Sequence, residues 1–257
     1  MMSLRLTILG SGTSHGVPMI ACNCAVCTSA DPHDRRTRPS AVFSYDGRNI
    51  LIDTAPELRL QSLAHGLRHV EALLYTHAHA DHVCGLDDVL RFNGVAGGAL
   101  PVYGSVETLA RLRRMFAYAF HDEPDYPSEK PHLVSHQIDG PFELFGRQVT
   151  PVPYLHGRTS VYGYRIGGIA YCPDCSFIPD ESLALLAGLD VLVLDAPLRR
   201  PHPTHFNLEQ AIAEARRIGA RRTYFTHISH RLHHALTNAE LPDGMSLAYD
   251  GLVCEST

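Results

Sequence analysis

The segment that most constrains this chain is Thr76-His77-Ala78-His79-Ala80-Asp81-His82, in which three imidazoles and one carboxylate occupy a few consecutive residues. It follows Ala72-Leu73-Leu74-Tyr75, a short apolar run that predicts a buried strand. The segment is therefore expected in a loop that leaves the end of a strand, where α/β proteins usually place their chemistry. Imidazole nitrogens and carboxylate oxygens in such a loop are suitable ligands for zinc, manganese or iron.

The spacing within this segment suits two adjacent ions. In an extended loop His77 and His79 project to the same side and can hold one ion, while Asp81 and His82 lie where the chain turns and can face a second. The alternative is a set of ordinary polar side chains in a chain that contains 17 histidines. The order of the residues, together with further candidate ligands downstream, favours the two-ion site.

A second strong pattern is the cysteine cluster Cys22, Cys24 and Cys27, which places three thiols in one loop. Thiolates bind zinc tetrahedrally, and a closed structural site needs a fourth ligand from elsewhere in the chain. The chain has seven cysteines, an odd number, which argues against a framework of disulfides. The alternative is three free cysteines, but the crowding favours a metal site.

The rest of the sequence predicts strands followed by helices in each half. Strands are expected at residues 4–9, 40–45, 48–53, 72–75, 101–104, 133–138, 142–145, 148–152, 162–166, 169–171, 190–195 and 222–225, and helices at 54–66, 85–93, 106–119 and 208–218. Several strands end in His or Asp, which suggests that their ends converge on one site. Residues 116–131 predict an irregular segment, with three open roles: a wall of a substrate pocket, a dimer contact or an inert surface loop.

Four further features leave alternatives open. Asp53 either orients a ligand histidine or caps a helix. His156, taken alone, is best interpreted as a satisfied polar side chain. Arg91 is either an anion contact near the site or the partner of local acids. The glycine-rich turn Gly10–Gly16 either cradles a phosphate or is a tight turn that needs a glycine with positive φ, and no helix is predicted after it to complete a dinucleotide-binding motif.

Length and composition indicate one globular domain that covers residues 1–257. The net charge is -5, so the whole protein does not attract nucleic acid or an anionic membrane, although Arg35, Arg36 and Arg38 form a local basic cluster. No apolar run approaches the length of a membrane span. The start of the chain, Met1–Arg5, lacks the apolar core of a signal peptide, and a cytoplasmic location is expected.

These patterns together resemble a known family over nearly the whole chain. LGSGTSHGVP, CNCAVC, ILIDTAPE, THAHADH, YCPDCS, LDAPLR, PTHFNLEQA and THISHRLHH occur here in the order typical of the phosphodiesterase branch of the metallo-β-lactamase superfamily. Within that branch the chain most resembles the phosphoribosyl cyclic phosphate phosphodiesterases of bacterial phosphonate breakdown. The resemblance implies an α/β fold, a four-layer αββα metallo-β-lactamase sandwich with two mixed sheets inside and helices outside.

The resemblance also implies a set of ligands and two catalytic residues. His77, His79 and His156 would hold one divalent ion, Asp81, His82 and His227 a second, and Asp174 would bridge them. Cys22, Cys24, Cys27 and His230 would form a separate structural Zn²⁺ site. The two active-site ions would be Mn²⁺ or Zn²⁺. His205, near the leaving group, and Asp81 are the catalytic candidates. One departure from the family pattern is the pair Cys172 and Cys175, which flank Asp174 and are expected to be buried, inert thiols.

The function implied is hydrolysis of a small, cyclic ribosyl phosphodiester, by a hydroxide that the two ions generate and with a proton supplied by His205. The first alternative is a tRNA 3′-end processing nuclease, but the chain shows no insertion that could serve as a tRNA-binding arm. Others are a thioester or lactone hydrolase and a metal-binding protein without turnover. A small-molecule substrate, no nucleic acid or membrane partner and a homodimer are the expected associations.

Overall fold

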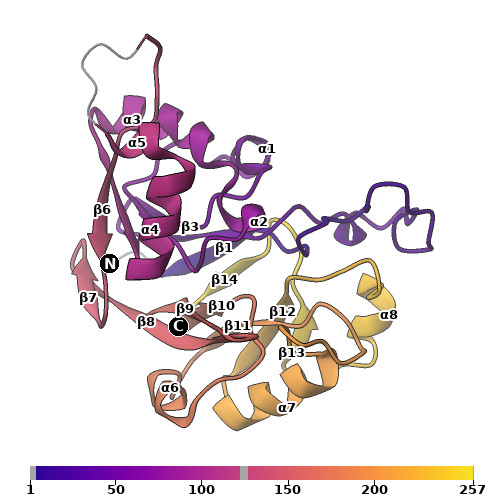
Figure 1. Cartoon of the computed structure of the whole chain (residues 1–257). Coiled ribbons are helices and arrows are strands. Elements are labelled where there is room, and N and C mark those ends of the chain that lie inside the picture. The colour runs from indigo at the N-terminus through magenta and orange to yellow at the C-terminus, as the bar shows by residue number, and fades with distance from the viewer. Residues whose placement is uncertain (1–3, 122–126, 257) are drawn as a thin grey trace.

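The computed structural model describes residues 4–121 and 127–256, which form two mixed sheets packed face to face with helices on both outer faces (Figure 1). This is the αββα sandwich predicted from the sequence. Residues 1–3, at the start of the chain, and residues 122–126, within the predicted irregular segment, lie outside the described residues.

The first sheet is built mainly from the N-terminal half of the chain. Its strand order is β14 (Val253–Glu255), β1 (Arg5–Gly10), β2 (Ser40–Tyr45), β3 (Arg48–Ile52), β4 (Ala72–Leu74), β5 (Leu100–Gly104) and β6 (Leu133–Gln137). Neighbouring strands from β14 to β3 are antiparallel, and those from β3 to β6 are parallel. The hairpin of β2 and β3 turns at Asp46-Gly47, as the sequence predicts.

The second sheet repeats this pattern with the C-terminal half. Its strand order is β13 (Met245–Leu247), β12 (Arg222–Thr226), β11 (Val191–Asp195), β10 (Ile169–Cys172), β9 (Thr159–Ile166), β8 (Arg147–His156) and β7 (Phe142–Leu144). From β8 to β10 the pairing is antiparallel and from β10 to β13 it is parallel, just as in β1 to β6. Strands β3 and β10 therefore occupy equivalent positions in the two halves.

Helices cover the outer face of each sheet. On the first sheet lie α1 (Leu58–Ala64), α2 (Ala80–Val83), the 3-10 turn η2 (Leu86–Val89), α3 (Leu90–Ala96), α4 (Val106–Met115) and α5 (Ala117–Phe120); on the second lie α6 (Asp180–Leu185) and α7 (Leu208–Ile218), with α8 (His234–Asn238) at its edge (Figure 1). Asn207 and Gln210 form a capping box that starts α7. Among the described residues no helix has both the length and the apolar character that a membrane span requires.

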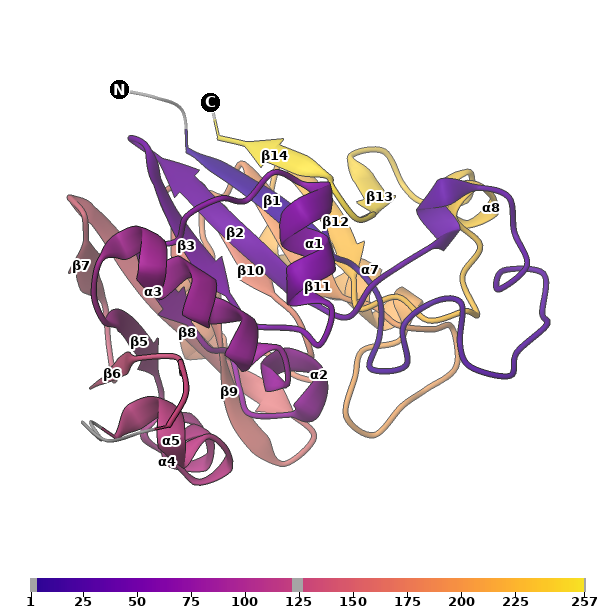
Figure 2. The same cartoon turned by 90° about the horizontal axis from the view of Figure 1, so that it is seen from above.

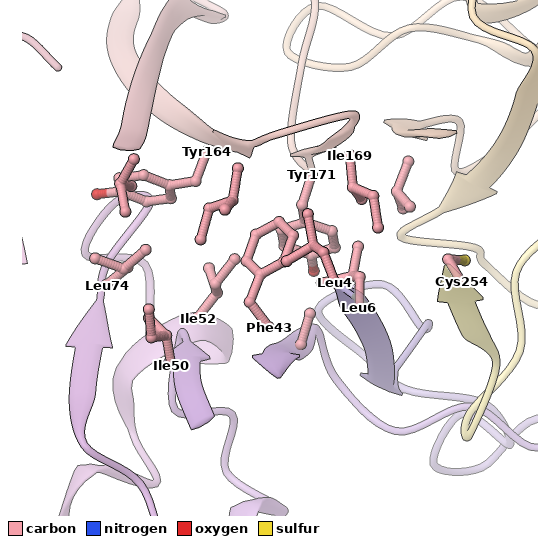
Figure 3. Packing of buried hydrophobic residues seen from close by; sticks show 14 of the residues in the cluster. Leu4, Leu6, Phe43, Ile50, Ile52, Leu74, Tyr164, Ile169, Tyr171 and Cys254 are labelled. Carbon is pink, nitrogen blue, oxygen red and sulfur yellow. The ribbon is translucent and has the colours of Figure 1, made fainter. Parts of the chain in front are cut away.

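The core explains why the central strands are apolar without interruption. In β3, Ile50 and Ile52 belong to the cluster between the sheets, whereas Leu51 belongs to the cluster under α1, α3 and α4. In β11, Val193 faces the other sheet and Leu194 faces α7. Side chains from both sheets meet in the middle layer (Figure 3). Strands buried on both faces lose the alternation that marks a half-exposed strand.

Two predicted helices differ from those observed. The helix expected from Thr54 begins only at Leu58, because the Thr54 backbone accepts a hydrogen bond from Gly85 and donates one to His82. These hydrogen bonds join the start of the segment to the histidine-rich loop. They outweigh the helix propensity of the residues before Leu58. The helix expected at 106–119 is interrupted at Phe116, which separates α4 from α5.

The segment between β1 and β2 projects beyond the sandwich beside α8 and includes a short 3-10 turn, η1 (Pro32–Asp34) (Figure 2). We call residues 17–35 the cysteine lobe. At its base Asp34 pairs with Arg36 at 3.0 Å, and both side chains are buried. Asp34 also accepts a hydrogen bond from the backbone of His234 in α8. Because Arg36 is paired here and Arg38 pairs with Glu57, these two arginines form no open basic groove.

Candidate metal centres

The histidines and acids predicted at strand ends lie at one edge of the sandwich. The loop after β4 supplies the HxHxDH segment, β8 ends in His156, Asp174 follows β10, β11 ends in Asp195 and His227 follows β12. Asp53 and Asp174 follow the equivalent strands β3 and β10, and both have positive φ, 59° and 53°. The strand ends thus converge as the sequence indicated.

The first set of candidate ligands contains His77, His79, His156 and Asp174, whose ligand atoms all lie within 4.8 Å of one another. Asp174 Oδ2 is 3.9 Å from His77 Nε2 and 3.8 Å from His156 Nε2. His79 is exposed and the other three side chains are buried. The structure therefore brings together His156 and His77, which are distant in sequence.

The second set contains Asp81, His82, His227 and the same Asp174. Asp174 Oδ1 is 3.1 Å from His82 Nε2 and 3.5 Å from His227 Nε2. Asp81 Oδ2 is 3.6 Å from His82 Nε2 and 3.5 Å from His227 Nε2. The two oxygens of Asp174 therefore face different sets, which is the geometry a bridging carboxylate needs.

The chemistry of these donors fits divalent cations. His77 Nε2, His82 Nε2, His227 Nε2 and Asp174 Oδ1 are buried and have no hydrogen-bond partner in the described structure. Buried polar atoms without a partner are costly, and several of them aimed at one point call for a ligand. Nitrogen and carboxylate oxygen are ligands that zinc and manganese accept. The roles of these side chains as ligands stay predictions.

Asp53 orients one histidine from each set. It accepts a hydrogen bond from His82 Nδ1 at 2.7 Å, and two more from the Thr76 backbone and hydroxyl. Thr76 Oγ1 in turn lies 3.0 Å from His77 Nδ1 and accepts its proton. A fixed partner on the second ring nitrogen leaves Nε2 free to bind a cation. Of the two roles left open for Asp53, the geometry supports orientation and not capping, because α1 begins at Leu58.

Burial sets the protonation of the first set. Removal from water lowers the pKa of His77 well below its usual value, and the nearby His82 lowers it further. Burial likewise lowers the pKa of His156, and partial removal from water lowers that of the more exposed His79. A buried imidazole resists carrying a charge. These three rings are therefore neutral at pH 7, which is the form that binds a metal.

The second set has the opposite electrostatics because carboxylates surround it. Burial alone would lower the pKa of His227, but Asp174, Asp195 and Asp81 outweigh it and raise that pKa to about 10. For His82 the same opposition, with Asp174 and Asp81 dominant over burial, raises the pKa well above its usual value. A divalent cation would take the place of these protons, so ion binding at this set should release protons.

His205 stands beside the second set without belonging to it. Its Nδ1 donates to Asp195 Oδ2 at 3.0 Å, and its ring stacks on that of His227 with the centroids 4.8 Å apart. The other oxygen of Asp195, Oδ1, lies 3.4 Å from His227 Nδ1. The fully buried Asp195 therefore contacts both rings, with a hydrogen bond to His205. Asp195 ends the strand predicted at 190–195, and no sequence pattern indicates this contact with two histidines.

The cysteine cluster meets a fourth donor, His230, as the resemblance implies. The Sγ atoms of Cys22, Cys24 and Cys27 lie 3.1, 3.5 and 3.7 Å from His230 Nδ1, and all three thiols are free. Tetrahedral zinc with ordinary bond lengths places sulfur and nitrogen ligands about 3.6 Å apart. The arrangement fits one zinc ion.

Cys172 and Cys175 differ from this cluster in both burial and reactivity. Both are fully buried on either side of Asp174. Burial raises the pKa of Cys172 to about 12 and that of Cys175 well above its usual value. They lie in the apolar cluster under α6 and α7 as neutral thiols.

Two cavities include residues of the candidate centre. One, of about 260 Å³, is lined by His205, the turn Thr13–Gly16, Arg200 and Arg231. The other, of about 390 Å³, is lined by His77 and His79 and by residues of α4 and β9. Arg91, for which an anion contact and a pairing with local acids were both open, is exposed and lines neither cavity. The arginines that do so were missed, because no local pattern marks them.

Comparison with known proteins agrees with this architecture. A family model described as a beta-lactamase superfamily domain matches residues 48–228. A crystal structure of a new diphosphatase from the PhnP family is 48% identical, covers 99% of this chain and 98% of that chain, and has a TM-score of 0.93. Zn²⁺-bound PqqB from Methylobacterium extorquens has a TM-score of 0.77 at 23% identity, with 97% of this chain and 99% of that chain covered, which is a likeness of fold.

A curated relative matches at the sequence level. An octanoyltransferase of Porphyromonas gingivalis is 37% identical over 255 residues, which are 97% of this chain but 51% of that protein. This chain therefore spans about half the length of that relative. The family model, the crystal structure and the site geometry agree: the chain belongs to the metallo-β-lactamase superfamily, as a PhnP-like metal-dependent hydrolase whose fold implies bound divalent ions.

Proposed function

We propose that this protein hydrolyses a small phosphodiester, and that the preferred substrate class is a five-membered cyclic ribosyl phosphate. The observation that carries the proposal is Asp174, whose two oxygens face two separate sets of candidate ligands. A pair of ligand sets that share one carboxylate suits a phosphate ester, because one cation can contact the attacking oxygen and the other a phosphate oxygen.

In this proposal His77, His79, His156 and Asp174 hold one divalent ion, and Asp81, His82, His227 and Asp174 hold the other. When bound, the two ions lower the pKa of a water and neutralise charge that grows on the phosphate. Cys22, Cys24, Cys27 and His230 hold a third ion, a structural zinc. About three ions per chain are therefore expected.

The protein's own residues orient the reaction and move the proton. Asp195 accepts a hydrogen bond from His205 Nδ1, so the proton to be transferred would be on Nε2, which has no partner among the described residues. His205 lines the 260 Å³ cavity, and the departing oxygen is accordingly expected on this side. There it would take its proton from His205, since a sugar alkoxide is a poor leaving group without one.

A second candidate substrate class is a disubstituted diphosphate. It is favoured by the 48% identity to a protein described as a diphosphatase. Both classes present a phosphorus atom with two substituents, and both would use the same ligand sets. The two cavities, of about 260 and 390 Å³, have sizes that suit small molecules.

The test is turnover of a panel by metal-replete protein, with metal content measured in parallel. The panel contains bis(p-nitrophenyl) phosphate, 2′,3′-cyclic and 3′,5′-cyclic nucleotides, ribose 1,2-cyclic phosphate and ADP-ribose. Preference for the five-membered cyclic esters supports the main proposal, and preference for ADP-ribose supports the second. Precursor tRNA, a thioester and a lactone are added for the rival activities. Full metal content with no hydrolysis of any phosphate substrate contradicts the proposal.

A further inference from the structure

A carboxylate outside both candidate centres joins two segments that are distant from it in sequence. Asp250 Oδ1 accepts hydrogen bonds from the backbone N–H and the hydroxyl of Ser11, each at 2.8 Å. Asp250 Oδ2 accepts hydrogen bonds from the backbone N–H of Thr37 at 2.8 Å and from its hydroxyl at 2.6 Å. The Thr37 hydroxyl also accepts a hydrogen bond from Gln61, so its own proton faces Asp250. These donors fit an ionised carboxylate, whose hydrogen bonds are stronger than those between neutral groups.

The position of Asp250 is fixed by the segment that crosses from the second sheet to the first, between β13 and β14 (Figure 2). This segment pairs with β1, because the backbone of Ile8 donates to Leu252 at 2.9 Å and accepts from Gly251 at 2.7 Å. Gly251 has φ of +92°, and a Cβ there would lie 2.8 Å from the ring of His65. Glycine suits this conformation, and the carboxylate next to it has a set place beside the end of β1.

Ser11 connects Asp250 to the loop that carries His227. The carbonyl of Ser11 accepts a hydrogen bond from the backbone N–H of Ile228 at 2.8 Å. The carbonyl of Ile228 in turn accepts one from Thr13 at 3.1 Å. Ile228 follows His227 directly, and His227 has φ of +61°, which is uncommon for a residue other than glycine. The backbone of this candidate ligand is therefore held by the turn after β1, which Asp250 holds in its turn.

The turn between these partners has no spare room. Of the two roles left open for the glycine-rich turn Gly10–Gly16, the structure supports the tight turn, and Gly16 has φ of +64°. The backbone N–H of Gly12 donates to the Thr37 carbonyl at 2.8 Å. A Cβ on Gly12 would lie 2.8 Å from the backbone oxygens of Arg36 and Thr37. The turn is therefore packed on both sides, and it transmits a displacement instead of absorbing it.

Other candidate ligands are oriented by different groups. His82 Nδ1 donates to Asp53, and Asp53 also orients His77 through a threonine hydroxyl. His156 Nδ1 donates to the carbonyl of Thr204 at 2.7 Å. Within the described residues, none of these side chains forms a hydrogen bond with the turn after β1. A change at this turn is therefore expected to affect the second set of candidate ligands and not the first.

We propose that Asp250 is a positioning residue for the second candidate metal site, where it holds the backbone of His227 through the turn after β1. His227 Nε2 is 3.5 Å from Asp174 Oδ1 and 3.5 Å from Asp81 Oδ2. Ligand distances in a metal site must be correct to about 0.2 Å, so a small displacement of His227 weakens binding. The inference rests on the ligand role of His227 in the proposed function. It concerns metal affinity and does not depend on which substrate is hydrolysed.

The experiment measures the affinity of each ion by competition with a chelator, with elemental analysis to count the ions. Asp250→Asn replaces one acceptor oxygen by an amide NH₂, which cannot accept from the backbone N–H groups of Ser11 or Thr37. We expect about 10-fold weaker binding of one active-site ion, with the other active-site ion and the zinc of the cysteine centre retained. Asp243→Asn, which changes an exposed carboxylate just before β13, is the matched control and keeps the affinity of all three.

A double-mutant cycle shows whether Asp250 acts through His227. Added to His227→Ala, the Asp250→Asn change should weaken metal binding further by less than about 2-fold, because the ligand it positions is already gone. Added to His79→Ala, it should still weaken the remaining ion by about 10-fold. Ser11→Ala removes only the hydroxyl donor and should weaken the same ion by a smaller factor. This milder variant gives the answer if Asp250→Asn does not fold.

Several outcomes would overturn the positioning role. These are unchanged affinity in both Asp250→Asn and Ser11→Ala, equal weakening of the two active-site ions, and a full further loss in the His227→Ala background. Phosphodiester turnover together with unchanged affinity in these variants leaves the proposed function standing and removes the role of Asp250. Selective loss of one ion in a protein that hydrolyses no phosphate substrate does the reverse.

Discussion

The two candidate metal centres are built in opposite ways. The His and Asp centre draws its candidate ligands from strand ends that range from His77 to His227, and these strands belong to both sheets. Asp53 lies 2.7 Å from Nδ1 of His82, and Asp195 lies 3.4 Å from Nδ1 of His227. The cysteine centre takes three thiols from one loop. Its apolar support is a small cluster of Val17, Val26 and Cys27 with their neighbours.

This difference determines what each ion does for the protein. The strand-end centre has its shape from the fold, so ions bound there would add chemistry and would neutralise its buried carboxylates. The cysteine lobe has little core of its own, so a zinc ion bound there would supply much of the energy that orders it. Loss of the first ions should therefore remove activity and leave the fold intact, whereas loss of the third should loosen the lobe.

The largest effect is expected from a substitution of Asp174, the residue that the two sets of candidate ligands share. Asp174→Ala should lose both ions and lower kcat/KM by more than about 10³-fold, since each set loses a ligand. The far-ultraviolet circular dichroism spectrum should keep its native form. Elemental analysis and turnover of bis(p-nitrophenyl) phosphate check this. Two tightly bound ions in the variant would show that Asp174 does not bridge.

His205→Gln tests whether proton transfer can be separated from metal binding. We expect full metal content and a loss of about 10²- to 10⁴-fold on a cyclic ribosyl ester, the cost of removing a general acid. The loss should be smaller for bis(p-nitrophenyl) phosphate, whose leaving group needs no proton. Steady-state kinetics on both substrates gives the comparison. Equal losses on the two would remove His205 from proton transfer.

Asp53→Asn sharpens the claim that the strand-end centre is organised by the fold. Asp53 holds His82 directly and His77 through Thr76, so both sets should bind metal about 10- to 100-fold more weakly. Competition with a chelator measures the affinity. Asp180→Asn, which changes an exposed carboxylate on α6, is the control. Unchanged affinity would mean that packing alone orients the two histidines.

Cys24→Ser tests whether the cysteine lobe depends on a bound zinc ion for its order. The variant should contain about one zinc ion fewer, keep its active-site ions and melt roughly 4 to 8 °C lower, as expected for a loss of about 2 kcal/mol in a domain of this size. Limited proteolysis should cut within residues 17–35. Cys84→Ser is the control, because Cys84 is exposed and outside the cluster. A melting curve identical to that of the unmodified protein would show that the lobe does not depend on its ion.

The smallest effect concerns the contact between the lobe and α8. Burial, with His33 and Arg36 nearby, lowers the pKa of His234 to about 4, against the influence of Asp31 and Asp34. An unfolded histidine titrates near ~6.5. Above that pH the neutral His234 therefore does not lower the free energy of unfolding. As the pH falls toward 4 this free energy declines, because only the unfolded chain takes the proton. His234→Gln should reduce the fall in melting temperature between pH 7 and pH 5 by about 2 °C.

Local patterns in the sequence predicted the parts of the site that lie close together in the chain. The HxHxDH segment, the cysteine cluster and the apolar strands before them required only spacing. His156 had no local sign of its role and was assigned through the resemblance alone. Asp195 contacts His205 and His227 across the fold, and no pattern around it indicates a function. The start of α1 was predicted at Thr54 and lies at Leu58 for a similar reason. The Thr54 backbone forms hydrogen bonds with a loop that is distant in sequence.

Three residues at the strand ends have a backbone conformation that lowers the stability of the fold. Asp53, Asp174 and His227 have φ values of 59°, 53° and 61°, a backbone conformation that costs residues other than glycine roughly 1 kcal/mol or more. Glycine adopts it freely. Glycine at these positions would relieve the backbone strain but would remove the carboxylates of Asp53 and Asp174 and the imidazole of His227. The strain is therefore retained for the side chains that these three residues bring to the strand ends.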